Sequence, residues 1–267
     1  MRLGSYSLSI VVLQLILSPY AFGGDNYGLK QQAFRRGESL TFLAAYNSRI
    51  TGNVVAGEAR LEVIPGSTAD NGAKTMHLVA QAHTRGLFNL FFKVENRYDS
   101  YLNEENLLPL RFVRNIREGR YRRLDDVFFD REMNLAYSPR DTISIPPDVQ
   151  DVISLLYFVR TLNLESAMEG DFFTIPYHLS DSVYMTRILF EGREQITTGL
   201  GTFHTFRLSP QVEDETIFGH SYPMTFWFSA DENKIPLLIE SALVVGSLRL
   251  ELKEYKGLRN ELRSRVR

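Results

Sequence analysis

Alternation of apolar and polar residues at every second position is the feature that most restricts how this chain can fold. The clearest case is residues 55–63, where Val55, Ala59 and Leu61 alternate with Glu58, Arg60 and Glu62. Residues 40–46, 76–83 and 247–253 repeat the pattern. A period of two is typical of strands with one buried and one wet face. Further strands are predicted at 94–101, 109–116, 121–129, 172–177, 183–190, 202–209, 225–229 and 235–245. The sequence therefore predicts a mainly β protein.

Turn residues separate these predicted strands. Glu118-Gly119 and Glu191-Gly192 each lie between two of them, and glycine accepts the positive φ that tight hairpins require. Asp231-Glu232-Asn233 predicts another turn, with Asn233 in the left-handed conformation. Short turns of this kind join neighbouring antiparallel strands, so we expect the sheet to be mostly antiparallel.

One helix is predicted, at residues 148–162. Pro146 and Pro147 give it a rigid start, and Asp148 supplies a carboxylate to cap its N-terminus. Its apolar residues cover well over half of the helix circumference: Val149, Val152, Ile153, Leu155, Leu156, Phe158, Val159 and Leu162. A helix of this kind is covered on most sides. We expect a curved antiparallel sheet of about ten to twelve strands, a half or closed barrel, with the helix packed in its concavity.

The N-terminus has the pattern of a secretory signal peptide. Arg2 is followed by an apolar run at residues 8–17 and by the small residues Ala21 and Gly23. We expect cleavage after Gly23 and a periplasmic or secreted protein. No later stretch reaches the roughly 20 apolar residues of a membrane-spanning helix. The sequence contains no cysteine, so it has neither a lipid-modified cysteine nor disulfides.

The expected organisation has four parts. A signal peptide (1–23) and an N-terminal lead (24–33) precede a single β-rich domain (34–255) and a basic tail (256–267). The tail is expected to be frayed, with contact to anionic lipid as the alternative. Without Arg2, 29 Lys and Arg residues face 32 Asp and Glu residues, a mature net charge near −3. This balance argues against a nucleic-acid-binding protein.

Motifs for catalysis, cofactors and metals are missing from the sequence. The five histidines have no metal-ligand spacing, and there is no nucleotide-binding loop or nucleophile motif. We therefore expect no cofactor and no metal, and favour a non-enzymatic protein. A hydrolase with dispersed carboxylates stays an alternative, because such a pair need not be close in sequence.

Two groups of residues are candidate binding sites. Adjacent aromatic residues present apolar groups to both faces of a strand, and they either form a ligand pocket or pack under the helix. The candidates for ligand contact are Phe88, Phe91, Phe92, Phe173 and Trp227. The second group is an arginine-rich hairpin, whose Arg111, Arg114, Arg122 and Arg123 are candidates for binding an anion. The alternative for the hairpin is cross-strand pairing with Asp125, Asp126 and Asp130.

The order of several short motifs resembles an exported bacterial family, domain of unknown function (DUF) family 3108. They are Phe34-Arg35-Arg36-Gly37-Glu38-Ser39-Leu40, Gly57-Glu58-Ala59, Leu108-Pro109-Leu110-Arg111-Phe112, Glu118-Gly119 and Trp227-Phe228-Ser229-Ala230-Asp231 with Ile235-Pro236-Leu237. The resemblance covers roughly residues 34–255. It implies a periplasmic or envelope β protein with no assigned activity, and it supplies no catalytic residues.

Three functions stay open. The leading hypothesis is a non-enzymatic envelope protein that binds an apolar or amphipathic ligand, such as a lipid, in the concavity. The second is a structural or adaptor protein that contacts an envelope polysaccharide or protein through the arginine-rich hairpin or a strand edge. The third is the hydrolase.

Overall fold

The computed structural model describes residues 33–48, 52–68, 74–86, 88–211, 223–243 and 246–266. The predicted signal peptide and nearly all of the N-terminal lead lie outside the described residues. No helix among the described residues is both long enough and apolar enough to cross a bilayer.

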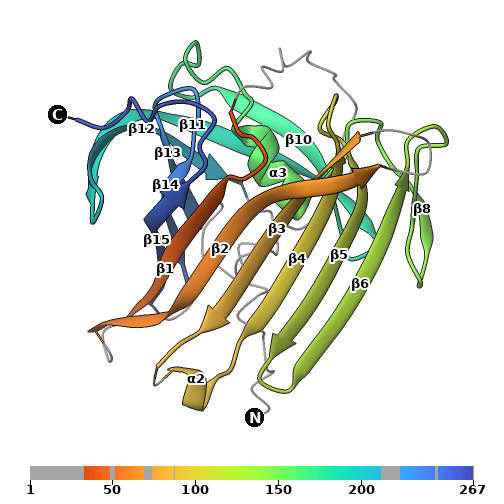
Figure 1. The fold of residues 1–267 in the computed structure, drawn as a ribbon, viewed down its shortest axis with the longest axis horizontal. Helices are drawn as coiled ribbons and strands as arrows, with labels where there is room; N and C mark the ends of the chain where they lie inside the picture. The colour runs from red at the N-terminus through yellow and green to blue at the C-terminus, as the bar shows by residue number, and fades with distance from the viewer. Residues whose placement is uncertain are drawn as a thin grey trace.

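The described strands form one curved sheet of fifteen strands that wraps around a helix (Figure 1). The strands are β1 (Ser39–Ser48), β2 (Gly52–Thr68), β3 (Lys74–Thr84), β4 (Glu95–Asn103), β5 (Pro109–Glu118), β6 (Tyr121–Asp130), β7 (Leu135–Tyr137), β8 (Thr142–Ser144), β9 (Gln150–Asp151), β10 (Phe172–Leu179), β11 (Ser182–Thr198), β12 (Gly201–Pro210), β13 (Met224–Ser229), β14 (Pro236–Ala242) and β15 (Ser247–Lys256). The helices within the described residues are α2 (Phe88–Phe91) and α3 (Val152–Val159). The predicted fold class is confirmed. Three strands of two or three residues, β7, β8 and β9, were not predicted because so short a segment shows no periodicity.

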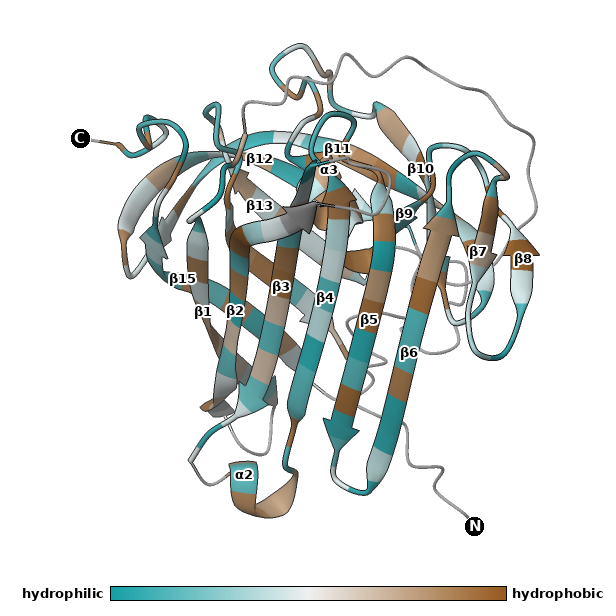
Figure 2. Ribbon diagram, turned by 45° about the vertical axis from the view of Figure 1, so that its right-hand side comes forward, coloured by the Kyte–Doolittle hydropathy of each residue, from teal (hydrophilic) through white to brown (hydrophobic). Residues whose placement is uncertain are grey.

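The first strand, β1, lies in the middle of the sheet. From β1 the chain runs outward strand by strand to β8, crosses through β9 and α3, and returns from β10 to β15. There β15 pairs with β1 antiparallel, with Leu40 opposite Tyr255. Among the described strands only β9 and β10 are parallel, because a long connection that contains α3 lies between them. Figure 2 shows the predicted alternation as brown and teal bands along β5 and β6.

Two of the three turn predictions need correction. Glu118 and Tyr121 are paired across a two-residue turn with Gly119 at φ 51°, as predicted. Gly192, however, lies in a bulge within the continuous strand β11, at φ 116°, so Glu191-Gly192 is not a hairpin turn. A glycine in a strand marks a bulge as readily as a turn. At the third turn, Lys234 and not Asn233 has the left-handed conformation, with φ 43°.

The helix α3 lies in the concavity as predicted, but it is shorter than predicted. Its N-cap is Asp151, whose carboxylate accepts hydrogen bonds from the backbone N–H groups of Ile153 and Ser154, both at 2.8 Å. The predicted cap Asp148 precedes β9, which pairs with β10 and so keeps this segment extended. At the other end the helix stops at the C-cap Arg160.

Two apolar cores lie on either side of α3. Ile153 and Tyr157 pack in a cluster made mostly of residues of β1 to β6, such as Phe112, with Leu237 of β14 and Leu252 of β15. Leu155 and Phe158 pack with residues of β10 to β13. The helix is therefore the apolar element shared by the two halves of the sheet.

A buried ion pair holds the C-terminal end of α3 to the residues that precede β1. Arg160 is 1% exposed and donates to both carboxylate oxygens of Glu38, at 2.6 and 2.8 Å. The same guanidinium donates to the carbonyls of Ala33 and Asn233. This side chain therefore fixes where the helix ends relative to the sheet.

The C-terminal tail is not frayed in its described part. The amide of Ser264 donates to the Asp231 carboxylate, and the amide of Val266 donates to the Thr202 carbonyl. Arg265 forms an isolated antiparallel bridge with Phe203. These hydrogen bonds hold the tail against β12. The expected domain boundary after residue 255 and contact of the tail with anionic lipid stay predictions.

Candidate functional site

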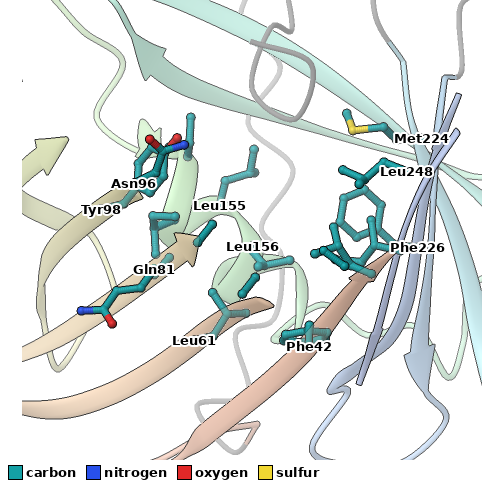
Figure 3. Close-up of a pocket in the computed structure, with 18 of the residues that line it drawn as sticks. Phe42, Leu61, Gln81, Asn96, Tyr98, Leu155, Leu156, Met224, Phe226 and Leu248 are labelled. Carbon is teal, nitrogen blue, oxygen red and sulfur yellow. The ribbon is translucent and has the colours of Figure 1, made fainter. Parts of the chain in front are cut away.

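A half-open cavity of about 310 Å³ lies between α3 and the inner faces of both halves of the sheet (Figure 3). Its walls are mostly aliphatic and aromatic side chains. Figure 3 shows Leu156 of α3 pointing into the space between Leu61 of β2 and Phe226 of β13. The helix thus covers one end of the concavity without filling it.

Small residues on three neighbouring strands explain why space remains. Ala44 is paired with Gly57 across β1 and β2, and Ala59 is paired with Ala82 across β2 and β3. All four residues line the cavity. Because the side chains of Ala44, Ala59 and Ala82 are short, this wall leaves space that the larger side chains of the helix do not fill. The small residues on the apolar face of β1, β2 and β3 therefore account for the cavity.

The opposite wall is formed by larger side chains that alternate along each strand. Phe226 and Phe228 of β13 line the cavity, whereas Trp227 between them donates its indole N–H to Glu194 at 2.7 Å. Leu248 and Leu250 of β15 line the same wall. Because strand side chains alternate between faces, each aromatic run divides into inner and outer residues.

Polar side chains gather at the end of the cavity away from α3. Asn96 of β4 donates to the Glu118 carboxylate of β5 at 2.6 Å, and both residues are buried. Thr84, at the end of β3, also lines the cavity. The cavity is thus apolar under α3 and polar near α2, a polarity that suits an amphipathic molecule.

The start of α3 contains a buried carboxyl group. Burial raises the pKa of Asp151 to about 6, against the hydrogen bonds that it accepts from Ser100 and from the first turn of the helix. Nearby, burial lowers the pKa of Arg131 to about 10. The Arg131 guanidinium donates to the carbonyl of Val149 at 3.2 Å, just before β9. These groups anchor the approach to α3 and do not line the cavity.

None of the five predicted aromatic residues lines the cavity. Phe88 and Phe91 belong to α2, and Phe92 follows it, at the end of the sheet opposite α3 (Figure 1). Phe173 packs against the core around Leu155 from β10, and Trp227 is on the outer face of β13. Any contact of these five residues with a ligand stays a prediction.

The arginine-rich hairpin is largely paired with its own carboxylates. Arg111 holds Asp126 in a two-point ion pair at 2.8 and 2.7 Å. Asp125 is buried and accepts from Arg114 and Arg123, with each arginine Nε at 2.7 or 2.8 Å. Arg114 and Arg123 thus help to lower the pKa of Asp125 against the effect of burial. Asp125 also pairs with Arg140, which reaches Asp181 at 3.0 Å.

Arg122 differs from the other three predicted anion-binding arginines. Its guanidinium donates to the backbone carbonyls of Gly119 and Tyr121, at 2.8 and 2.7 Å. The structure therefore does not bring Arg111, Arg114, Arg122 and Arg123 together around one empty space. Anion binding by this set stays a prediction.

Among the described residues, no group of three or more histidine, aspartate or glutamate side chains is placed to hold a metal ion. The residues that sequence reasoning missed are the small ones of β1 to β3 and the helix residues that face them. The signal was present in the sequence, because Ala44, Gly57, Ala59 and Ala82 each belong to the apolar set of positions in the alternation of their own strand. Whether these small residues leave a cavity depends on the side chains that lie across from them in the fold, which the sequence alone does not show.

Comparison with known proteins supports the fold. A β-barrel-like protein of domain of unknown function DUF1849 from Brucella abortus superimposes with a TM-score of 0.57 at 11% identity, over 84% of this chain and 99% of that chain. A protein from Bacteroides fragilis, provisionally described as exported and with a YmcC-like fold, has a TM-score of 0.37 at 12% identity, over 84% and 99% of the two chains. The latter likeness is too low to support an argument.

Sequence comparison identifies the family. None of the curated proteins is significantly similar to this chain. The profile of "Protein of unknown function (DUF3108)" matches residues 41–253, from β1 to β15, which is most of the chain. This match confirms the resemblance seen in the order of the short motifs. The chain belongs to the DUF3108 family of proteins of unknown function.

Proposed function

We propose that this protein is an exported, non-enzymatic protein that binds an apolar or amphipathic ligand, such as a lipid, in the cavity beneath α3. The observation that best supports the proposal is the half-open cavity of about 310 Å³ with apolar walls. Ligand pockets range from roughly 300 to 1,000 Å³, so this cavity fits a group the size of one hydrocarbon chain. Each CH₂ group transferred there from water contributes about 0.8 kcal/mol.

The distribution of polar groups orients the ligand. A hydrocarbon chain lies under Leu155 and Leu156 of α3, where the walls are apolar. A polar group of the ligand lies near Thr84, Asn96 and Glu118, which hydrogen-bond to water or to the ligand more readily than the apolar wall does. An amphipathic molecule satisfies both ends of the cavity.

Filling the cavity tests the proposal. Delipidated protein is titrated with the apolar dye N-phenyl-1-naphthylamine and, separately, with an envelope lipid extract followed by native mass spectrometry. Leu156→Trp places a larger ring in the space between the two walls, and we expect at least tenfold weaker dye binding and no retained lipid. Leu124→Trp is the matched control, because Leu124 is exposed on β6 and does not line the cavity. It should bind like the wild type.

Two outcomes would count against ligand binding in this cavity. Failure of the wild-type protein to bind dye or lipid would reject it and favour the adaptor alternative, which uses the arginine-rich hairpin. Equal binding by Leu156→Trp and the wild type would place the ligand elsewhere. Export is tested separately by sequencing the N-terminus of the native protein, which we expect to begin at Gly24.

A further inference from the structure

The turn between β3 and β4 exposes two large apolar side chains. Leu90 is 78% exposed and Phe91 is 85% exposed, and both belong to α2. The aromatic residues on either side of them face the protein. Phe88 contacts the ring of Tyr46, with 6.0 Å between ring centroids, and Phe92 lies against Gly119. The turn is thus held by its two outer aromatics while Leu90 and Phe91 project into solvent.

This turn is joined to the polar end of the cavity. Thr84 lines the cavity, and its hydroxyl donates to Asn89 of α2 at 3.1 Å and accepts from the backbone N–H of Val94 at 3.0 Å. Val94 also lines the cavity, directly after the turn. Figures 1 and 2 place α2 beyond the ends of β3 and β4, at the end of the sheet opposite α3. Leu90 and Phe91 therefore project from the cavity rim.

Basic residues flank the exposed turn. The amide of Gly119, in the β5–β6 turn, donates to the Lys93 carbonyl at 2.8 Å, so this second turn lies beside α2. Arg117 and Arg122 are directly opposite each other in the register of β5 and β6, and Arg120 lies between them in the turn. Like charges in opposite positions repel, which makes this an unfavourable arrangement for the isolated sheet.

The nearby carboxylates form their ion pairs with other basic residues, although the charges of Arg117 and Arg122 act with Lys93 to lower the pKa of Glu95. Glu58 pairs with Arg85 at 2.9 Å, and Glu95 pairs with Lys93 at 2.7 Å. Glu118 is buried and accepts from Asn96. Within the described part of the chain, no carboxylate forms an ion pair with Arg117, Arg120 or Arg122. The rim is therefore positively charged, although the whole chain carries a net charge of −2.

We propose that Leu90 and Phe91, with the flanking Arg117, Arg120 and Arg122, dock the α2 end of the cavity onto an anionic phospholipid bilayer. Exposed leucine and phenylalanine beside arginine match the chemistry of the bilayer interface, where apolar groups enter the acyl boundary and basic groups meet anionic headgroups. This docking rests on the proposed function for its role, since it aligns the cavity with a lipid source. It is measured independently of what the cavity holds.

Vesicle flotation tests the docking. Purified protein is mixed with vesicles of phosphatidylcholine alone or with 30% phosphatidylglycerol, at low and high salt. We expect the wild type to float only with the anionic vesicles and to be released by salt. The Leu90→Ser/Phe91→Ser variant should bind at least about tenfold more weakly, because the apolar contacts are lost. The triple variant with Arg117, Arg120 and Arg122 changed to glutamine should bind roughly a hundredfold more weakly, at about fivefold per charge.

Controls separate docking from folding and from ligand binding. Met168→Ser removes another side chain that is 71% exposed, in the connection between α3 and β10, and it should float like the wild type. The Leu90→Ser/Phe91→Ser variant should still bind N-phenyl-1-naphthylamine in the absence of vesicles. Wild-type protein that does not float, or variants that float equally well, would overturn the inference. So would a change from dimer to monomer in Leu90→Ser/Phe91→Ser without any vesicle binding by the wild type, because the surface would then serve self-association.

Discussion

The Asp151→Asn substitution should change how the stability of the protein depends on pH. Asp151 caps α3, the helix that covers the cavity, and its carboxyl group is fully buried. Asparagine retains the oxygen that accepts from Ile153 and Ser154 and is itself a favoured N-cap residue. What it removes is the charge that aspartate acquires as the pH rises.

The magnitude follows from the pKa of Asp151. Burial raises this pKa from 3.8 to about 6, so the folded state binds the proton more tightly than the unfolded state does. The resulting stability is complete below pH ~3.8 and is lost as the pH rises through about 6. At about 1.4 kcal/mol for each pKa unit, the full loss is ~3 kcal/mol. Between pH 4.5 and 7.5 the loss from this group is about 2 kcal/mol.

Urea denaturation followed by circular dichroism measures this effect. The free energy of unfolding is determined for the wild type and for Asp151→Asn at pH 4.5, 5.5, 6.5 and 7.5. Subtracting one protein from the other cancels the titration of groups that both share. We expect the difference to move by about 2 kcal/mol in favour of Asp151→Asn between the lowest and highest pH, with most of the change below pH 7.

The reasoning is refuted by a difference that stays constant over this range, because Asp151 would then titrate equally in the folded and unfolded states. A difference that moves in favour of the wild type as the pH rises would also refute it. A pH-independent offset added to the expected change would not refute it, since the Ser100 hydrogen bond to the carboxylate also changes.

Two further predictions concern other buried charges. Glu38→Gln and Arg160→Met should each destabilise the protein by about 3–5 kcal/mol in urea denaturation, because each leaves the partner buried without its counter-charge. The Glu38→Leu/Arg160→Met double variant should lose far less than the sum, and additive losses would contradict the pairing. His178→Phe tests the opposite pH dependence, because burial lowers the pKa of His178 from 6.5 to about 4. Its contribution to stability is present above pH 6.5 and is lost as the pH falls, by about 2.5 kcal/mol between pH 7.5 and 4.5, so an unchanged slope in His178→Phe would rule out this assignment.

The effects of Asp151 and His178 oppose each other over the same pH range. The two residues are paired across β9 and β10, at the start of α3. Protonation favours the folded state through Asp151 and disfavours it through His178. The wild type should therefore show a weaker pH dependence than either variant, although both groups are strongly perturbed.

Local patterns were enough to predict most strands and the existence of the helix. The alternation along residues 55–63 identifies a strand because a period of two needs no knowledge of the partner strand. The Glu118-Gly119 turn was predictable for the same reason, since its geometry depends on one glycine and its neighbours. Family membership also follows from the order of motifs along the chain.

Local patterns failed wherever two structures were compatible with the same residues. Gly192 accepts a positive φ in a bulge as well as in a turn, and the pairing of β11 with β12 selected the bulge. Asp148 and Asp151 are both suitable caps, and the pairing of Asp151 with His178 decided where the helix begins. In each case a strand distant in sequence made the choice.

The sequence by itself determined that this chain forms strands with one apolar face, joined in order by hairpins, and a single broad apolar helix. Only the tertiary structure decided which face is concave and what lies across from it. Phe226 and Trp227 are neighbouring aromatic residues of one predicted strand, and of these two only Phe226 lines the cavity. Ala59 of β2 and Leu250 of β15 line the same cavity because β1 pairs with β15, strands about two hundred residues apart. Alternation specifies that two faces differ, whereas a cavity depends on the sizes of side chains that meet across the fold.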